Sequence, residues 1–363
     1  MTRIVISGYY GFGNIGDEGV LAGMLSSLRP RIPGVAFVVL SSNPEETMRM
    51  HGVPAVSRTG APALRAITGA DLFISGGGSL IQDATSARSA LYYLGVLEAA
   101  TLLARRTMVF SQGLGPIRRR WIRAMAGRTL NRVHVVSLRD EDSQRFAQEI
   151  GVRRPTQLVA DPVFALDPAP PEEAERFLAG LPRPRIGLAL RPVPGARVAE
   201  PVIDAVRAVV KETRGSVVTL AFHPAQDLDL SREVAGAVQG RVISGLSPTE
   251  MLAVVGALDV LAGVRLHALI CAVAMGIPAV GLSYDPKVDG LFRRVGAGPL
   301  LPLAGLNPGQ LRQALAATWG GREALQAHLR GAAGALREEA IRAADLAAAL
   351  LSMPPRSSMT GRN

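Results

Sequence analysis

The stretch that decides the fold is ISGYYGFGNIGDEGVL, residues 6–21, in which three glycines separate an apolar run from a helical pattern. Gly11, Gly13 and Gly16 spell G-x-G-x-x-G, the spacing of a dinucleotide-binding turn. A bound pyrophosphate favours a helix start without acids, and the ribose favours a carboxylate about 20 residues further on. Here two acids, beginning with Asp17, occupy the helix start, and the next apolar run ends in VVLSSN. The sequence therefore argues against NAD and leaves a glycine-rich turn that serves another purpose.

Short apolar runs alternate with helix-length segments along most of the chain, which is typical of a parallel α/β sheet. In the first half, the expected strands are Ile4–Ser7, Phe37–Leu40, Leu72–Ser75, Met108–Ser111, Val133–Ser137 and Gln157–Val159. In the second half, they are Ile186–Leu190, Val217–Phe222, Val242–Ile243, Val260–Ala262, Ala279–Leu282 and a strand near Leu300. The pattern predicts an α/β protein with two Rossmann-like, doubly wound domains that face a cleft, as in the GT-B architecture.

A proline-rich segment, DPAPPEEAERFLAGLPRPR, interrupts this alternation and marks the domain boundary. We expect an N-terminal domain over residues 1–168 and a C-terminal domain over residues 169–352. An alanine-rich helix from about Glu323 to Leu351 closes the second domain, and residues 353–363 form a tail.

The formal net charge of +10 favours an acidic partner, such as a phosphorylated substrate, an anionic membrane face or nucleic acid. With only 4% aromatic residues, the chain has few base-stacking side chains, so we expect no nucleic acid. The densest basic cluster is RRRWIRAMAGR, residues 118–128. It reads either as a helix that lies on anionic lipid headgroups or as an ordinary solvated helix. The single Cys271 permits no intrachain disulfide, and no secretory signal is evident, which together predict a cytoplasmic protein.

Lysine is rare in this chain, because 38 of its 40 basic residues are arginine and only Lys211 and Lys287 are lysine. Lys287 follows a strand and a proline turn in SYDPKVD, where ligand-binding loops occur. Arg265 and His267, in GVRLHALI, lie between the preceding strand and an apolar helix. Parallel strands end at one edge of a sheet, so these three side chains could meet there and bind an anion. His267 can also donate a proton near neutral pH.

Three other motifs follow strands of the first half. In the first, Asp17 either caps a helix or faces the cleft with Asn14, where its carboxylate could orient a hydroxyl or accept its proton. In the second, Gly77, Gly78 and Ser79 of GGGSLIQD suggest a helix start that holds an anion, and SQGLGP repeats a glycine turn. In the third, Arg139 of SLRDEDS either pairs with the neighbouring acids or points at an anionic substrate. The histidines show no zinc spacing, and we expect no metal.

The ordered set GYYGFGNIGDEGVL, GGGSLIQD, QGLGP, SLRDEDS, RLHALI and SYDPKVD resembles the polysaccharide pyruvyl transferases, in particular the bacterial cell-wall (CsaB-type) branch. The resemblance covers most of residues 3 to 295. Val20 and Ser111 depart from the family motifs, and neither departure bears on the chemistry.

The resemblance implies a GT-B-like fold and transfer of pyruvate from phosphoenolpyruvate, as a 4,6-ketal, onto a sugar. The implied acceptor is N-acetylmannosamine on an undecaprenyl-diphosphate-linked precursor of a secondary cell-wall polymer, of the kind that anchors S-layers. Arg265, His267 and Lys287 match the family residues that bind the donor and assist the chemistry. Asn14, Asp17 and Arg139 match positions near the substrates.

Within this reading, His267 is the expected general acid and Asp17 the expected base. No cofactor is expected, since phosphoenolpyruvate is a co-substrate, and the basic surface suits a peripheral enzyme at the inner membrane face. The alternatives are a GT-B glycosyltransferase that uses a nucleotide sugar, with Glu250 or Asp285 on the ribose, and a non-catalytic sensor. The oligomeric state and the exact acceptor stay open.

Overall fold

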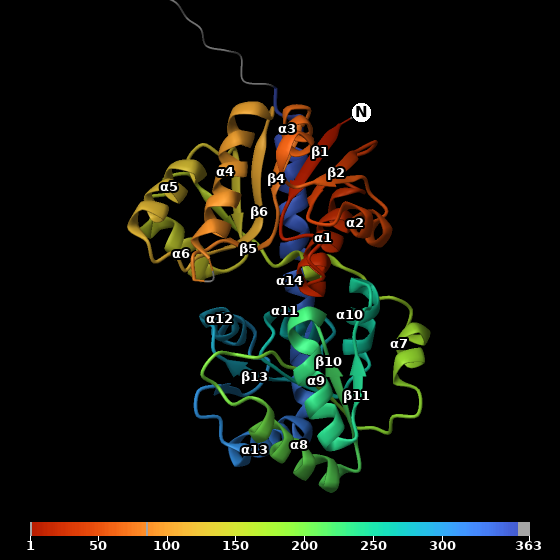
Figure 1. Ribbon diagram of the computed structural model, residues 1–363. Helices are drawn as coiled ribbons and strands as arrows, with labels where there is room; N and C mark the ends of the chain where they lie inside the picture. The colour runs from red at the N-terminus through yellow and green to blue at the C-terminus, as the bar shows by residue number, and fades with distance from the viewer. Residues whose placement is uncertain (1, 85, 355–363) are drawn as a thin grey trace, which may run out of the picture. The chain divides into compact units, whose positions relative to one another are not determined.

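The computed structural model describes residues 2–84 and 86–354 and contains two parallel α/β units (Figure 1). The first unit comprises the residues up to Phe12, Gly23–Pro162 and the residues from Glu339 onward. The second comprises Gly13–Ala22 and Val163–Glu338. Each unit has its own parallel sheet and apolar core, which confirms the predicted class of two Rossmann-like domains. Most of the tail expected at 353–363 lies outside the described residues, which end at residue 354.

The first unit is built on an eight-stranded sheet of order β3-β2-β1-β4-β6-β7-β8, with β5 paired to β6. Its strands are β1 (Arg3–Ser7), β2 (Ala36–Ser41), β3 (Ala55–Ser57), β4 (Leu72–Ser75), β5 (Gly78–Ile81), β6 (Thr107–Leu114), β7 (Val135–Leu138) and β8 (Thr156–Leu158). The helices between them are α1 (Ile15–Leu28), α2 (Pro44–His51), α3 (Gly60–Thr68), α4 (Ala87–Leu103), α5 (Arg120–Leu130) and α6 (Glu141–Glu149). The strands of this sheet pair in parallel, so the loops that follow them share one edge.

The glycine-rich motif GGGS behaves differently from the expected helix start. Gly78 begins strand β5, which pairs with β6, and the next helix begins only at Ala87. The prediction of an anion held by helix N–H groups at Ser79 is therefore wrong. The expected turn SQGLGP is likewise a strand up to Leu114, because a register shift after Val109 lets β6 continue beside β7.

The second unit has a six-stranded sheet of order β11-β10-β9-β12-β13-β14. Its strands are β9 (Arg185–Ala189), β10 (Ser216–Leu220), β11 (Arg241–Ile243), β12 (Val260–Gly263), β13 (Ala279–Ser283) and β14 (Leu300–Pro302), close to the six predicted. The helices are α7 (Pro171–Leu178), α8 (Ala199–Thr213), α9 (Pro224–Val238), α10 (Pro248–Gly256), α11 (Leu266–Ala274), α12 (Pro286–Val295) and α13 (Pro308–Gly320). The last helix, α14 (Arg322–Ser352), begins in this unit, and its residues from Glu339 belong to the first unit. All sheet neighbours again run parallel.

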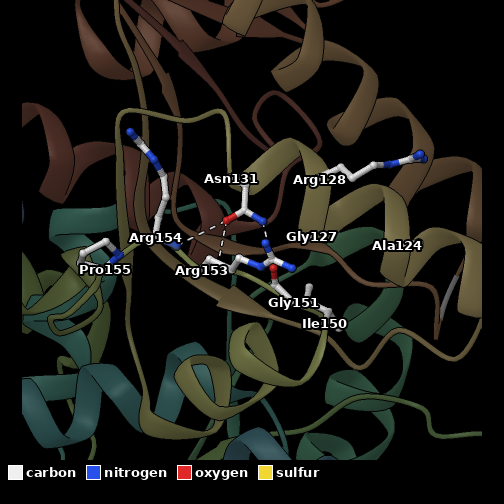
Figure 2. Close-up of a pocket in the computed structure, with 9 residues that line it drawn as sticks. All are labelled: Ala124, Gly127, Arg128, Asn131, Ile150, Gly151, Arg153, Arg154 and Pro155. Carbon is white, nitrogen blue, oxygen red and sulfur yellow. Dashed lines mark hydrogen bonds between the residues drawn. The ribbon is translucent and has the colours of Figure 1, made fainter.

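A single asparagine fastens the end of α5 to the loop that leads into β8 (Figure 2). Asn131 Oδ1 accepts hydrogen bonds from the backbone N–H groups of Arg153, at 2.8 Å, and Arg154, at 3.3 Å. Its Nδ2 donates to the Gly151 carbonyl at 2.9 Å. The loop has no regular backbone hydrogen bonds of a helix or strand. The side chain of Asn131 supplies partners for its backbone N–H and C=O groups instead.

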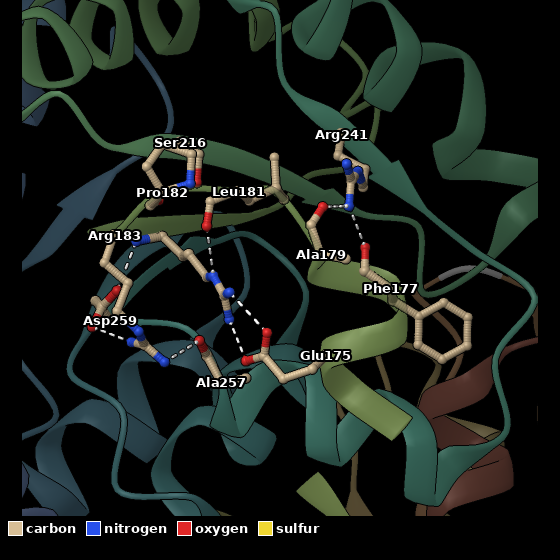
Figure 3. Close-up of polar contacts among 11 residues, drawn as sticks. Glu175, Phe177, Ala179, Leu181, Pro182, Arg183, Ser216, Arg241, Ala257 and Asp259 are labelled. Atoms are coloured by element: carbon tan, nitrogen blue, oxygen red, sulfur yellow. Dashed lines mark hydrogen bonds and ion pairs between the residues drawn. The ribbon is translucent and has the colours of Figure 1, made fainter. Parts of the chain in front are cut away.

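An ionic network secures the amino edge of the second sheet, the edge opposite the loops that follow the strands (Figure 3). The Arg185 guanidinium, at the start of β9, binds both oxygens of Glu175 on α7 at 2.7 and 2.9 Å. Asp259, just before β12, accepts the Arg185 N–H at 2.7 Å and the Arg183 side chain at 2.6 Å. The carboxylate of Asp259 thus joins two adjacent strands at their first residues.

We expect Asp259→Ala to lower the free energy of unfolding by about 1–3 kcal/mol, because it leaves the Arg185 N–H without its acceptor. Urea unfolding measures this directly. The matched control is Asp229→Ala, since that side chain is fully exposed and has only a weak contact of 4.0 Å with Arg232. Equal stability losses for the two variants would contradict the assigned role of Asp259.

Candidate functional site

The start of α1 belongs to the second unit, where it docks on the end of β10. The Ile15 N–H donates to the Phe222 carbonyl at 2.8 Å, which ties the first turn of the helix to this sheet edge. Asn14 caps the helix: its Oδ1 accepts the Gly16 N–H at 3.2 Å. Its Nδ2 donates to Asp17 Oδ2 at 2.5 Å, so the half-buried carboxylate is oriented by Asn14 and does not itself cap the helix.

Gly16 brings this turn against His267. A methyl group at position 16 would lie 2.3 Å from His267 Nδ1 and 2.6 Å from its Cβ, which no side chain tolerates without moving the imidazole. The third glycine of the G-x-G-x-x-G pattern therefore admits a histidine ring, where a dinucleotide fold would use it for helix–strand packing. Asp17, the next residue along α1, and His267 were the two predicted catalytic residues, and both belong to the second unit.

Arg265 caps α11, directly after β12, as the sequence predicted, but its guanidinium already has a partner. Its Nε donates to Asp227 Oδ2 at 3.0 Å, and its Nη2 contacts both Asp227 Oδ1 and Gln226 Oε1. Asp227 is completely buried and also accepts the His223 N–H at 2.9 Å. A carboxylate that the sequence reading did not single out thus fixes the Arg265 fork in place.

Lys287 lies in the first turn of α12, after β13, and β13 is the neighbour of β12. Helices α11 and α12 contact each other, so Lys287 and His267 stand on adjoining helices at one sheet edge. Asp285 caps α12 by accepting the Lys287 N–H at 3.0 Å. Glu250 closes a capping box with Ser247, and these hydrogen bonds lower the pKa of its carboxyl group. Both acids considered for a nucleotide ribose are therefore engaged in helix caps.

His223 follows β10 and is almost completely buried beside the Asp227–Arg265 pair. Burial lowers the pKa of its imidazole, and the nearby charges of Arg265 and Arg191 lower it further, so the ring is neutral at pH 7. Its Nδ1 finds no hydrogen-bond partner among the described residues. The edge thus carries a neutral imidazole at β10 and cationic groups at β12 and β13.

The remaining predicted residues lie together in the first unit. Arg139, only 6% exposed, donates from Nη1 to Asp161 at 2.8 Å and from Nη2 to Ser79 Oγ at 3.1 Å. A methyl group on Gly113 would lie 2.6 Å from that Ser79 oxygen, so the QGLGP strand packs directly on the pair. Gly77 and Gly78 are buried beside them, and Gly78 has a φ of +84° that favours glycine. Arg139 is paired with acids, Asp161 and the neighbouring Asp140, as the first interpretation predicted. That it points at an anionic substrate stays a prediction.

Three residues of these clusters were not predicted: Asp161, Asp227 and Arg191. Asp227 follows His223 by four residues in HPAQD, and this spacing at a helix start could have suggested a cap that reaches back. Arg191 follows β9 as Arg265 follows β12, a signal available in LRPVP. Asp161 has no local signal, because only the parallel pairing of β7 with β8 brings it to Arg139.

Solved structures with the same architecture include several enzymes that act on sugar nucleotides. A putative UDP-N-acetylglucosamine 2-epimerase from Listeria monocytogenes is 14% identical, with 98% of both chains covered and a TM-score of 0.63. HepE from Anabaena, solved with UDP and glucose, is 14% identical with a TM-score of 0.64, over 97% of this chain and 100% of that chain. At this identity the likeness establishes only the fold, which is GT-B-like with two Rossmann-like domains.

The family model for polysaccharide pyruvyl transferase matches residues 14–286, and the chain belongs to this family of transferases. The match begins at Asn14 and ends at Pro286, beside Lys287, so it takes in the turn of α1 and the Arg265–His267 turn. A comparison with curated proteins gives no match.

Among the described residues, no helix combines the length and apolar character needed to cross a bilayer. No cluster of three or more histidine, cysteine, aspartate or glutamate side chains suited to a metal ion occurs there either.

We expect Gly16→Ala to reduce turnover at least tenfold, because the added methyl displaces the His267 ring while the helix itself tolerates alanine. Steady-state kinetics and a thermal melt separate this effect from unfolding. Gly19→Ala is the control on the same helix, since its methyl would meet Val163 at an ordinary 3.5 Å. Full activity in Gly16→Ala would show that the close approach to His267 has no role.

Proposed function

We propose that this protein transfers the pyruvyl group of phosphoenolpyruvate, as a 4,6-ketal, onto a sugar and releases phosphate. The acceptor in this proposal is N-acetylmannosamine of an undecaprenyl-diphosphate-linked cell-wall precursor, as in the CsaB-type branch. The supporting observation is the packing of His267 against the α1 turn that carries Asn14 and Asp17. Cationic side chains at the neighbouring strand ends suit a donor with a carboxylate and a phosphate close together.

The chemistry assigned to these groups starts at the enol carbon of the donor. His267 gives a proton to C3, which leaves an oxocarbenium-like C2, and one sugar hydroxyl attacks C2 while Asp17 takes its proton. The C2–O bond to phosphate then breaks, the second hydroxyl closes the ketal, and its proton leaves with the phosphate. Two hydroxyl protons are lost, one proton is gained at C3 and one at phosphate, so the reaction balances. Fixed positive charge stabilises the anionic groups throughout.

In the first unit, Ser79 is the group that we assign to the acceptor. Arg139 and Asp161 hold its hydroxyl in one orientation, and the neighbouring glycines leave room for a ligand close to the backbone. Arg139 acts through Ser79 in this assignment, as a positioning residue.

The first test of this function is phosphate release from phosphoenolpyruvate in the presence of a disaccharide-diphosphate-lipid acceptor that contains N-acetylmannosamine. His267→Ala is expected to lower kcat by a factor of about 10² to 10⁴, the range for a lost general acid. His51→Ala, at the end of α2 in the first unit, is the control. Calorimetry adds a second criterion, because tight binding of a UDP-sugar without binding of phosphoenolpyruvate would favour a glycosyltransferase instead.

A lipid-linked acceptor would bring the enzyme to a membrane, and the basic surface around α5 is suited to bind one. Trp121 is 54% exposed on this helix, and the adjoining Arg118, Arg120 and Arg128 form no ion pair with any described residue. A cavity of about 660 Å³ opens at the end of the helix, lined in part by Arg128 and Arg153 (Figure 2). An exposed indole among unpaired guanidinium groups suits the interface of an anionic membrane. We therefore assign this surface to the inner membrane face and its diphosphate headgroups.

We expect the protein to co-sediment with vesicles that contain phosphatidylglycerol and not with pure phosphatidylcholine vesicles. The variant Arg120→Glu/Trp121→Ser/Arg128→Glu should bind at least tenfold more weakly, since each basic residue near the surface contributes about 1 kcal/mol. The matched control, Arg197→Glu/Arg207→Glu, makes the same charge reversals on exposed positions of the second unit. If both variants bind like the wild type, or lose binding equally, α5 is not the docking surface.

A further inference from the structure

Arg191 is a half-buried cation that forms no ion pair with a described residue, at the sheet edge that carries His267. It follows β9, which lies between β10 and β12 in the sheet, so it stands between His223 and Arg265. Its Nε is buried and has no hydrogen-bond partner among the described residues. Its Nη1 donates to the Tyr284 hydroxyl at 3.1 Å, and its guanidinium lies 5.8 Å from the centre of that ring.

None of these contacts neutralises the charge. Tyr284 is an uncharged phenol with 42% of its surface exposed, and Arg191 forms no ion pair with a described carboxylate. A buried N–H without a hydrogen-bond partner is costly, and an oxyanion of a ligand would supply the acceptor that the Arg191 Nε lacks. Burial is the main cause of the lowered pKa of the neighbouring His223, the charge of Arg265 is the next, and the Arg191 charge adds a smaller contribution.

The contrast with Arg265 decides which guanidinium is open. Arg265 donates hydrogen bonds from Nε and Nη2 to Asp227 and Gln226. These two donors form the edge of the guanidinium that could otherwise bind an oxyanion in bidentate fashion. Asp227 is fully buried and serves Arg265, and no other carboxylate among the described residues forms an ion pair with Arg191. Two arginines at adjacent strand ends therefore have different tasks, one held by protein and one left for a ligand.

From this arrangement we infer that Arg191 directly binds one anionic end of the donor, a small phosphorylated carboxylic acid, through its Nε edge. The inference rests on the proposed function and goes further, because it transfers the main anion contact from Arg265 to Arg191. Arg265 becomes a positioning residue that fixes the α11 turn beside His267. Tyr284 keeps the Arg191 fork oriented while the site is empty, since its hydroxyl takes only one of the donors.

Binding of phosphoenolpyruvate, inorganic phosphate and pyruvate to the wild type and to Arg191→Gln tests this role by calorimetry. We expect phosphoenolpyruvate to bind about ten- to a hundredfold more weakly to the variant, the range for a lost charge-assisted hydrogen bond. The phosphate and pyruvate arms identify which anionic end contacts Arg191, because only one of them should weaken. KM for the donor should rise with little change in KM for the acceptor. Arg207→Gln, an exposed arginine that caps the Ala237 carbonyl, is the control.

Two outcomes separate this inference from the proposed function. Equal affinity of the wild type and Arg191→Gln for phosphoenolpyruvate would overturn the role of Arg191 and leave the proposed function intact. No binding of phosphoenolpyruvate to the wild type would overturn the proposed function, and no binding of phosphate or pyruvate either would overturn both. Arg191→Lys, which keeps the charge and loses the fork, replaces Arg191→Gln if that variant does not fold, and the same loss is expected of it.

Discussion

The site depends on one steric constraint, the absence of a side chain at Gly16. The backbone of α1 approaches the His267 ring so closely that a single methyl group would have to displace it. The hydrogen bond from Ile15 to Phe222 fixes the helix start on the same sheet edge, and Asn14 orients the carboxylate of Asp17. The α1 turn that carries Asn14 and Asp17 is thereby fixed against the His267 ring by close contacts of its backbone.

Charge at this edge is divided unequally among its cations. The buried Asp227 compensates Arg265, whereas Arg191 stays uncompensated beside a neutral His223. The unpaired Nε of Arg191 costs stability in the free protein, because a buried donor without an acceptor loses its hydrogen bond to water. The two edges of the second sheet differ in whether their arginines are paired with carboxylates. At its amino edge, Arg183 and Arg185 are fully paired with Asp259 and Glu175, and that network only stabilises the fold.

Sequence reasoning located strands well where apolar runs are long and failed where glycine motifs are ambiguous. GGGSLIQD looks like a turn before a helix, yet Gly78–Ile81 pairs with β6 as a strand, because a neighbouring β6 with a shifted register offers it partners. The short β3 also went unpredicted, since three residues carry too little periodicity. Helix caps are easier to find in a sequence, because the hydrogen bonds that Asp140 and the Ser247–Glu250 box make at the start of their helices are local.

The sequence by itself determined the alternation of strands and helices, the loops that carry Arg265, His267 and Lys287, and the order of motifs that the family model matches. These features follow from local periodicity and from the rule that parallel strands end at one edge. Only the tertiary structure decided the partner of each charge. Asp227 reaches Arg265 across 38 residues and Asp161 reaches Arg139 across 22, so only the pairing of the strands determines which guanidinium is bound to a carboxylate.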